Sequence, residues 1–275
     1  MRVDRRQTRR PNLLTIEEIL HFARHIPRVA HSIGHMGVRQ STVNDLQYLL
    51  RIEEAAWYED GRASADMLQS RIETFPEGAL CATMDGELVG FACWQIISQS
   101  LNEIIGDWST LTDSGFIKKT HDPVGQTLFG VNLSTLPRAP RDVVWAISEA
   151  SKKLTIRLGL SYFVLGSRIP GFRRFAAEMD VETYIHTLRS GRYLDPEVDL
   201  YTLLGLTPIR ILPNFFSDPQ SHNFGVLMSW KNPFSDMQDC LNLWEEYRWF
   251  DLWRRKFRWR KNYERSKTKY EGSNQ

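Results

Sequence analysis

Hydrophobic positions along the chain switch between the spacing of helices and the spacing of strands. Apolar residues recur every three or four positions over residues 44–57 and 64–74, which predicts two amphipathic helices. Two strand-like runs follow, residues 79–84 and 87–98, and Asp85-Gly86 joins them. Because both central residues of a tight hairpin turn need positive φ, this dipeptide predicts a β-hairpin.

The rest of the pattern predicts one mixed sheet with helices packed against it. A short strand near residues 38–40 is predicted before the two helices, and a long insertion at 99–126 after the hairpin. The later predicted elements are a strand at 127–136, a helix at 142–157 capped by Asp142, a strand at 162–166, a short helix at 199–204, and strands at 207–215 and 224–230. Their order, β-α-α-β-β-β-α-β-α-β-β, predicts a single α/β domain.

The two ends of the chain differ from this central domain. Residues 1–36 are predicted to form a basic tail and a helical extension, in which Thr15 and Glu18 make a capping box. Residues 37–233 hold the α/β domain. Residues 234–275 are predicted to continue a long helix, starting at 233, into a basic tail in which aromatic and basic residues alternate. The net charge of +2 therefore conceals an acidic body between two basic ends.

The cysteines and the lengths of the apolar runs indicate which classes of protein are not expected. The three cysteines, Cys81, Cys93 and Cys240, are scattered, so the spacing predicts neither a zinc site nor a disulfide framework. No apolar run approaches the roughly 20 residues that a membrane-spanning helix needs. We therefore expect a cytoplasmic protein without a bound metal or a transmembrane segment.

Several stretches resemble the GNAT family of acyltransferases in the order in which that fold places them. They are the helix residues 50–57 (LRIEEAAW), the strand residues 87–93 (ELVGFAC) and the late segment 200–206 (LYTLLGL). In the second half, Gly166–Phe172 (GSRIPGF), Asp195-Pro196 and Gly225–Pro233 (GVLMSWKNP) are similar to GNAT domains fused to carbon–nitrogen hydrolases and to GNAT-like domains of polyketide loading modules. The resemblance implies a GNAT fold over about residues 37–233.

The resemblance also implies where the cosubstrate, acetyl-CoA or a longer acyl-CoA, would bind. Its pantetheine arm would contact the fourth strand, and its pyrophosphate the loop that leads into the next helix. The cofactor-binding residues implied are Val131, Asn132, Leu133, Ser134, Arg138, Arg141 and Asp142. This loop departs from the family pattern, because it lacks the family's glycines and two prolines replace amide donors. Arg138 and Arg141 are expected to compensate with charge.

The same resemblance implies candidate catalytic residues. Tyr201, four residues before Gly205, matches the tyrosine that protonates the departing thiolate. Glu54, its neighbour Glu53 and, in the insertion, Asp107 are candidate bases for the acceptor amine, and Glu54 is preferred. His222 is a further candidate because its ring can titrate near neutral pH.

The leading hypothesis is transfer of an acyl group to an amine of a small molecule or peptide. One alternative keeps the fold and uses an acyl carrier protein as donor, with S-transfer or decarboxylation. Another is a GNAT-like scaffold that binds partners without catalysis. The basic C-terminal helix favours an acidic carrier protein or precursor peptide over nucleic acid as a partner.

Overall fold

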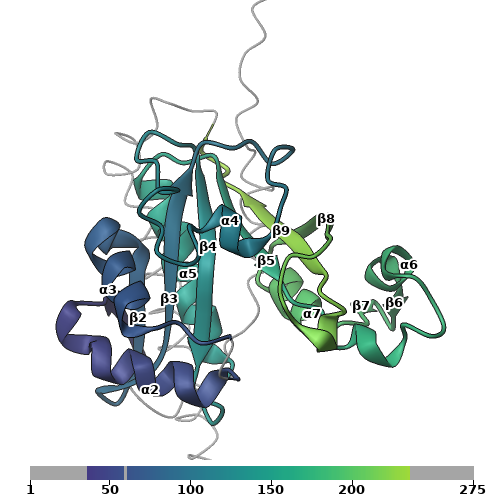
Figure 1. The fold of residues 1–275 in the computed structure, drawn as a ribbon, viewed down its shortest axis with the longest axis horizontal. Helices are drawn as coiled ribbons and strands as arrows, with labels where there is room; N and C mark the ends of the chain where they lie inside the picture. Colours follow the sequence, from purple (N-terminus) through teal and green to yellow (C-terminus); the bar gives the residue numbers. More distant parts are fainter. Residues whose placement is uncertain (1–35, 59–60, 236–275) are drawn as a thin grey trace, which may run out of the picture.

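The computed structural model describes residues 36–58 and 61–235, and these form a seven-stranded sheet with helices on both faces (Figure 1). The strands lie in the order β1-β2-β3-β4-β5-β9-β8. Their bounds are β1 Met36–Gln40, β2 Ala79–Met84, β3 Glu87–Ile97, β4 Thr127–Thr135, β5 Tyr162–Ser167, β8 Thr207–Leu212 and β9 Gly225–Lys231. Only β4 and β5 pair in parallel; the other neighbours in this sheet are antiparallel.

Helices α2 (Leu46–Ala56) and α3 (Ala65–Thr74) pack on one face of the sheet, and α5 (Asp142–Arg157) packs on the other (Figure 1). Of these three helices, only α3 has a side-chain cap at its start. Ser64 accepts a hydrogen bond from the amide of Met67 at the start of α3. The short helix α4 (Trp108–Leu111) lies within the insertion that follows β3.

Beyond β5 the chain leaves the main sheet and returns to it. The 3₁₀ turn η4 (Phe172–Arg174) and helix α6 (Val181–His186) lead into a two-stranded ribbon of β6 (Leu188–Arg189) and β7 (Arg192–Tyr193), which projects to one side (Figure 1). Helix α7 (Pro196–Leu203) then carries the chain back to β8.

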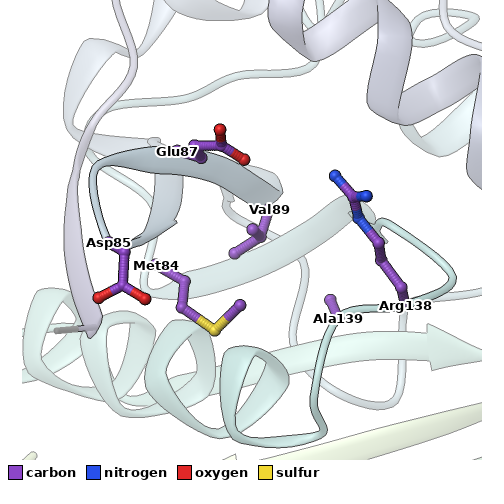
Figure 2. Close-up of a pocket in the computed structure, with 6 residues that line it drawn as sticks. All are labelled: Met84, Asp85, Glu87, Val89, Arg138 and Ala139. Carbon is purple, nitrogen blue, oxygen red and sulfur yellow. The ribbon is translucent and has the colours of Figure 1, made fainter. Parts of the chain in front are cut away.

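The predicted hairpin is confirmed, with Asp85 and Gly86 at φ of 52° and 89° between β2 and β3. The turn lies close to the loop between β4 and α5. Residues from both line a pocket of about 360 Å³: Met84, Asp85, Glu87, Val89, Arg138 and Ala139 (Figure 2).

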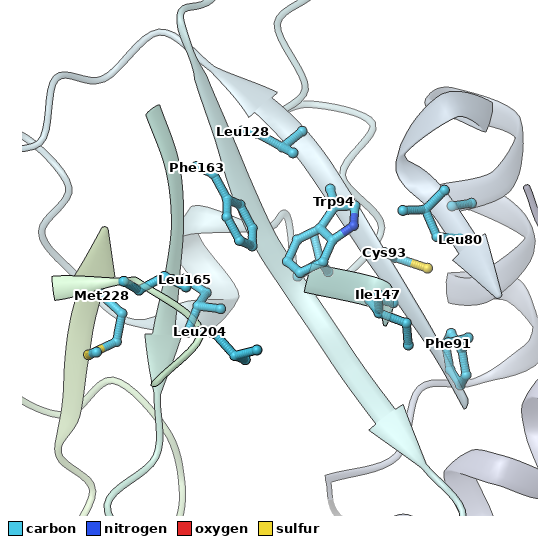
Figure 3. Close-up of a cluster of buried hydrophobic side chains, with 14 of the residues drawn as sticks. Leu80, Phe91, Cys93, Trp94, Leu128, Ile147, Phe163, Leu165, Leu204 and Met228 are labelled. Atoms are coloured by element: carbon cyan, nitrogen blue, oxygen red, sulfur yellow. The ribbon is translucent and has the colours of Figure 1, made fainter. Parts of the chain in front are cut away.

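The main core joins both halves of the sheet. Trp94 of β3 meets the edge of Phe163 of β5, with ring centroids 5.0 Å apart, and Leu165 and Met228 lie on the same side (Figure 3). A second cluster, around Phe129, Val164 and Phe215, packs beneath the insertion. The predicted order of elements and the mixed α/β class are therefore confirmed.

Some predicted boundaries were wrong. Asp142 does not cap α5. Arg141 is the N-cap residue, because its carbonyl oxygen accepts hydrogen bonds from the amides of Val144 and Trp145. The helix expected at 199–204 starts at Pro196, since the Asp195 carboxylate accepts hydrogen bonds from the amides of Glu197 and Val198. The strand expected at 207–215 ends at Leu212.

The predicted helical extension at 13–35 and the predicted C-terminal helix from residue 236 onward lie outside the described residues. Within the described ranges, every helix is too short or too polar to cross a bilayer.

Candidate functional site

Strands β4 and β5 run side by side for only part of their length. Their parallel register joins Thr127 to Tyr162, Leu128 to Phe163 and Phe129 to Val164, and it stops there. β4 nevertheless continues to Thr135, while β5 continues along β9. From residue 130 to 135, β4 is therefore paired with β3 alone among the described strands, and its other edge is left open.

The register with β3 determines which backbone groups face this open edge. The amide of Leu136 bonds to the carbonyl oxygen of Val89, so these residues form a hydrogen-bonded pair of the antiparallel ladder. Such pairs alternate along a ladder, which makes Ser134 the next bonded residue. The N–H and C=O groups of Leu133 and Thr135 consequently point away from β3, toward the open edge. This places two backbone donors where a β-ladder is missing.

A bulge in β4 lies at the point where the two strands separate. Trp94 pairs with Gly130 and Cys93 with Asn132, so Val131 is the extra residue. Its carbonyl oxygen accepts a 2.8 Å hydrogen bond from the indole nitrogen of Trp108. The bulge and Trp108 of the insertion thus mark the inner end of the open edge.

The side chains of Asn132 and Ser134 point toward α2 rather than toward the open edge. Ser134 Oγ donates to Glu53 Oε1 and accepts from Trp57 Nε1 at 2.8 Å. Asn132 Nδ2 donates to the same Glu53 oxygen at 3.2 Å. Glu53 is buried, and its second oxygen accepts the amide of Ala63 at 2.7 Å. The two β4 side chains are therefore held in an internal network.

A buried arginine completes this network. Arg71 of α3 is 2% exposed, and it donates to Gly115 O at 2.6 Å and to Asn132 Oδ1 at 3.1 Å. Burial is the main influence on the pKa of Arg71 and lowers it, while the Glu53 carboxylate opposes this shift. A positive and a negative group thus lie on either side of Asn132 beneath β4.

Arg168, just after β5, contacts three separate parts of the chain. Its guanidinium lies 5.3 Å from the centre of the Trp57 ring. Its Nε donates to Asp218 Oδ2 at 2.8 Å, and its Nη1 lies 3.9 Å from Glu197 Oε1. One side chain therefore connects α2, α7 and the loop before β9.

Tyr201 and Glu197 lie one helical turn apart on α7, so both face Arg168. Burial, followed by the nearby Glu197 carboxylate, raises the pKa of the Tyr201 phenol. Burial also raises the pKa of Glu197 to about 7, although Arg168 opposes this shift. The phenol thus stays protonated at neutral pH, as a proton donor to a leaving group must.

The loop entering α5 offers free backbone amides beside two arginines. No described residue accepts a hydrogen bond from the amides of Arg138, Arg141 or Asp142. The side chains of Arg138 and Arg141 are exposed. Free amides at a helix start, together with guanidinium groups, suit a pyrophosphate. Although Pro137 and Pro140 contribute no amide, this loop fits the diphosphate of a coenzyme A ester.

Two predicted catalytic residues lie apart from this arrangement. Glu54 is exposed on α2, and its neighbour Glu53 is the one that contacts β4. His222 is exposed in the loop before β9, where its ring meets the edge of Phe172 at 5.4 Å. Within the described part of the chain, no group of His, Cys, Asp and Glu could hold a metal ion.

Sequence reasoning missed the residues that join the two sides of the site. Trp57 and Arg168 lie inside segments that resemble the GNAT family, and Glu197 directly follows Asp195-Pro196. Glu53 was named as a candidate base, and its burial could have been predicted because it follows the buried Leu49 by four residues on the same stripe of α2.

Comparison with known proteins agrees with this geometry. No family model matches the chain. The uncharacterised N-acetyltransferase YkwB of Bacillus subtilis is 32% identical over 209 residues, which cover 74% of this chain and 92% of that protein. The probable hydrolase YhcX of the same organism is 32% identical over 167 residues, 60% of this chain. The chain spans only 32% of the length of YhcX.

Two solved structures share the fold. The loading GNATL domain of CurA from Lyngbya majuscula superposes with a TM-score of 0.62 at 18% identity, covering 72% of this chain and 98% of that domain. The GNAT-like decarboxylase of GphF, solved with isobutyryl-CoA, gives 0.59 at 23% identity, covering 71% and 99%. These matches confirm the predicted resemblance. With parted central strands and a relative aligned over nearly its whole length, the chain belongs to the GNAT superfamily.

Proposed function

We propose that this protein transfers an acetyl or longer acyl group from acyl-CoA to an amine of a small molecule or peptide. The observation that carries the proposal is the open edge of β4, where the backbone of Leu133 and Thr135 has no neighbouring strand. A pantetheine arm carries amide groups that can replace the missing strand. The free amides at the start of α5 lie at the end of the same edge, where a pyrophosphate would follow.

In this reaction the amine nitrogen attacks the thioester carbonyl carbon. The C–N bond forms and the C–S bond breaks, without an acyl-enzyme. The N–H of Leu133 donates to the carbonyl oxygen as negative charge develops on it. Tyr201 gives its phenolic proton to the departing sulfur. A base removes the proton that the amine loses.

The proposal also includes a cellular compartment and a binding partner, both based on the sequence. The scattered cysteines favour a cytoplasmic, reducing environment. The basic segment after residue 247 favours an acidic carrier protein or precursor peptide as the source of the acceptor or donor.

The test is to incubate the full chain with acetyl-CoA, isobutyryl-CoA or malonyl-CoA and a panel of primary amines, and to follow release of free CoA thiol. Amine-dependent thiol release, with the N-acyl product identified by mass, is the expected result. Conversion of malonyl-CoA to acetyl-CoA without thiol release would instead indicate a decarboxylase. Failure to bind any CoA ester in calorimetry would indicate a non-catalytic scaffold.

A further inference from the structure

Among the acidic residues around Arg168 in the described structure, Asp195 and Asp218 accept hydrogen bonds, whereas the Glu197 carboxylate accepts none. Asp195 accepts from the amides of Gly171 and Glu197 and from Tyr184 Oη, and Asp218 accepts from Arg168 and Ser221. In the described structure, the Glu197 carboxylate has only the 3.9 Å ion pair with Arg168. About a third of its side chain is exposed. It is therefore a carboxylate available to a ligand.

Glu197 is near Tyr201 and is linked through other side chains to β4. Glu197 precedes Tyr201 by one turn of α7, so both side chains lie on the same face of the helix. Arg168 connects Glu197 to the Trp57 ring, and Trp57 bonds to Ser134, which follows Leu133 on β4. The carboxylate thus lies beside the phenol that would protonate sulfur, and a chain of contacts through Arg168 and Trp57 connects it to the strand that would hold the thioester.

We propose that Glu197 is the general base that takes the proton from the acceptor amine. This role rests on the proposed acyl transfer. When the amine nitrogen bonds to the thioester carbon, its extra proton passes to the Glu197 carboxylate, directly or through one water. Tyr201 supplies the proton that sulfur gains. The protonated carboxyl group then returns a proton to the tyrosine phenolate, and the site is ready for another turnover.

The charges around Glu197 suit a base that works near neutral pH. Burial raises its pKa to about 7, the Arg168 guanidinium lowers it, and the carboxylates of Asp195 and Asp218 raise it. Tyr201 faces it from the same helix, and Gln220 joins Arg168 from the loop before β9 at 3.4 Å. A general base is most effective when its pKa lies near the working pH.

The experiment is a pH profile of kcat/KM from pH 5.5 to 9 in the full chain, with acetyl-CoA as donor and two primary amines of different basicity, benzylamine and glycinamide, as acceptors. The wild type is expected to show an acidic limb near pH 7 that does not move with the amine. Glu197→Gln is expected to lose this limb and about 100-fold of kcat, with acetyl-CoA binding unchanged. Glu197→Asp should keep the limb and part of the rate.

Glu182→Gln is the matched control, because this glutamate is exposed on α6 and pairs only with His186 in the described structure. It should leave the profile unchanged. A Glu197→Gln variant that binds acetyl-CoA and keeps both the limb and the rate would overturn the role of Glu197 alone. An acidic limb that follows the basicity of the amine would do the same. Absence of transfer to every amine tested would overturn the proposed function, and with it this role.

Discussion

Tyr201 is the residue on which the proposed proton transfer to sulfur depends. Its phenol is kept protonated by burial and by Glu197, one turn away. Tyr201→Phe removes only the hydroxyl group, so we expect kcat to fall about 100-fold or more while the affinity for acyl-CoA is retained. Rates of thiol release and calorimetric titration with CoA measure the two effects separately.

Tyr193→Phe, on the half-exposed ribbon beside α7, is the matched control and should keep the wild-type rate. An undiminished kcat in Tyr201→Phe would remove the acid assignment without changing the family.

Glu197 also predicts a pH dependence of stability. Its pKa rises from 4.5 to about 7 on folding, so the unfolded chain gives up this proton first as pH increases. The group's favourable contribution to stability is complete below pH 4.5 and is lost as pH rises to 7. Because its side chain is partly exposed, we expect the wild type to lose about 1–2 kcal/mol relative to Glu197→Gln over this range.

Urea unfolding of both proteins at pH 5 and pH 8 measures this difference. Equal midpoints for the two proteins at both pH values would contradict it.

A candidate site residue could be predicted from the sequence where its identification depends on spacing between nearby residues. Resemblance pointed to Tyr201 through its spacing from Gly205, and Tyr201 lies beside Arg168 and Glu197. The contacts of Arg168 with Trp57 and Asp218 could not be predicted, because these residues come from segments more than 100 and about 50 positions away. Their meeting depends on how β5 and the loop before β9 are packed.

Among the elements, the start of α5 has the clearest predicted role in binding. Replacing both Arg138 and Arg141 by Ala removes two exposed positive charges beside the free amides. We expect the Kd for acetyl-CoA to rise about tenfold or more, with a weaker dependence on salt concentration, because charge-assisted bonds to phosphate are lost.

Acetyl-pantetheine, which lacks the pyrophosphate, provides the control for this variant. Its affinity should be the same for the wild type and the double variant. A parallel loss with both donors would show that the loop acts on something other than the phosphates.

The contact between α3 and β4 depends on a buried charge. Arg71→Met removes the donor to Gly115 O and Asn132 Oδ1, and it also removes a positive charge that interacts with Glu53. We expect the free energy of unfolding to fall by about 3–5 kcal/mol, measured by urea denaturation. Arg51→Met, on the exposed side of α2, should cost less than about 1 kcal/mol. Equal losses in the two variants would contradict a special role for Arg71.

For the whole molecule, the question is how a sheet with parted central strands stays one folding unit. Only three residue pairs join β4 to β5, but the core beneath them is continuous through Trp94 and Phe163 (Figure 3). Trp94→Ala should therefore destabilise both halves together, by about 3–5 kcal/mol, in a single transition. Tyr58→Ala, which is exposed, should change stability by less than about 0.5 kcal/mol.

Circular dichroism and tryptophan fluorescence, followed through the same denaturation, are expected to coincide. Two separate transitions would show that the halves unfold independently.

The order of elements could be predicted from hydrophobic spacing and turn residues, and the hairpin at Asp85-Gly86 in particular. The parting of β4 and β5 could not be derived from residue patterns. Residues 127–135 look like an ordinary strand, and nothing in their side chains marks the place where pairing stops.

The open edge of β4 has a consequence for how such a protein can change over evolution. Every amino acid except proline carries the same N–H and C=O groups. A donor held by the main chain at positions 133 and 135 therefore places no demand on which side chains stand there. Substitutions can accumulate along this strand while the contacts persist, and recognition of the donor leaves little trace in the letters of the sequence.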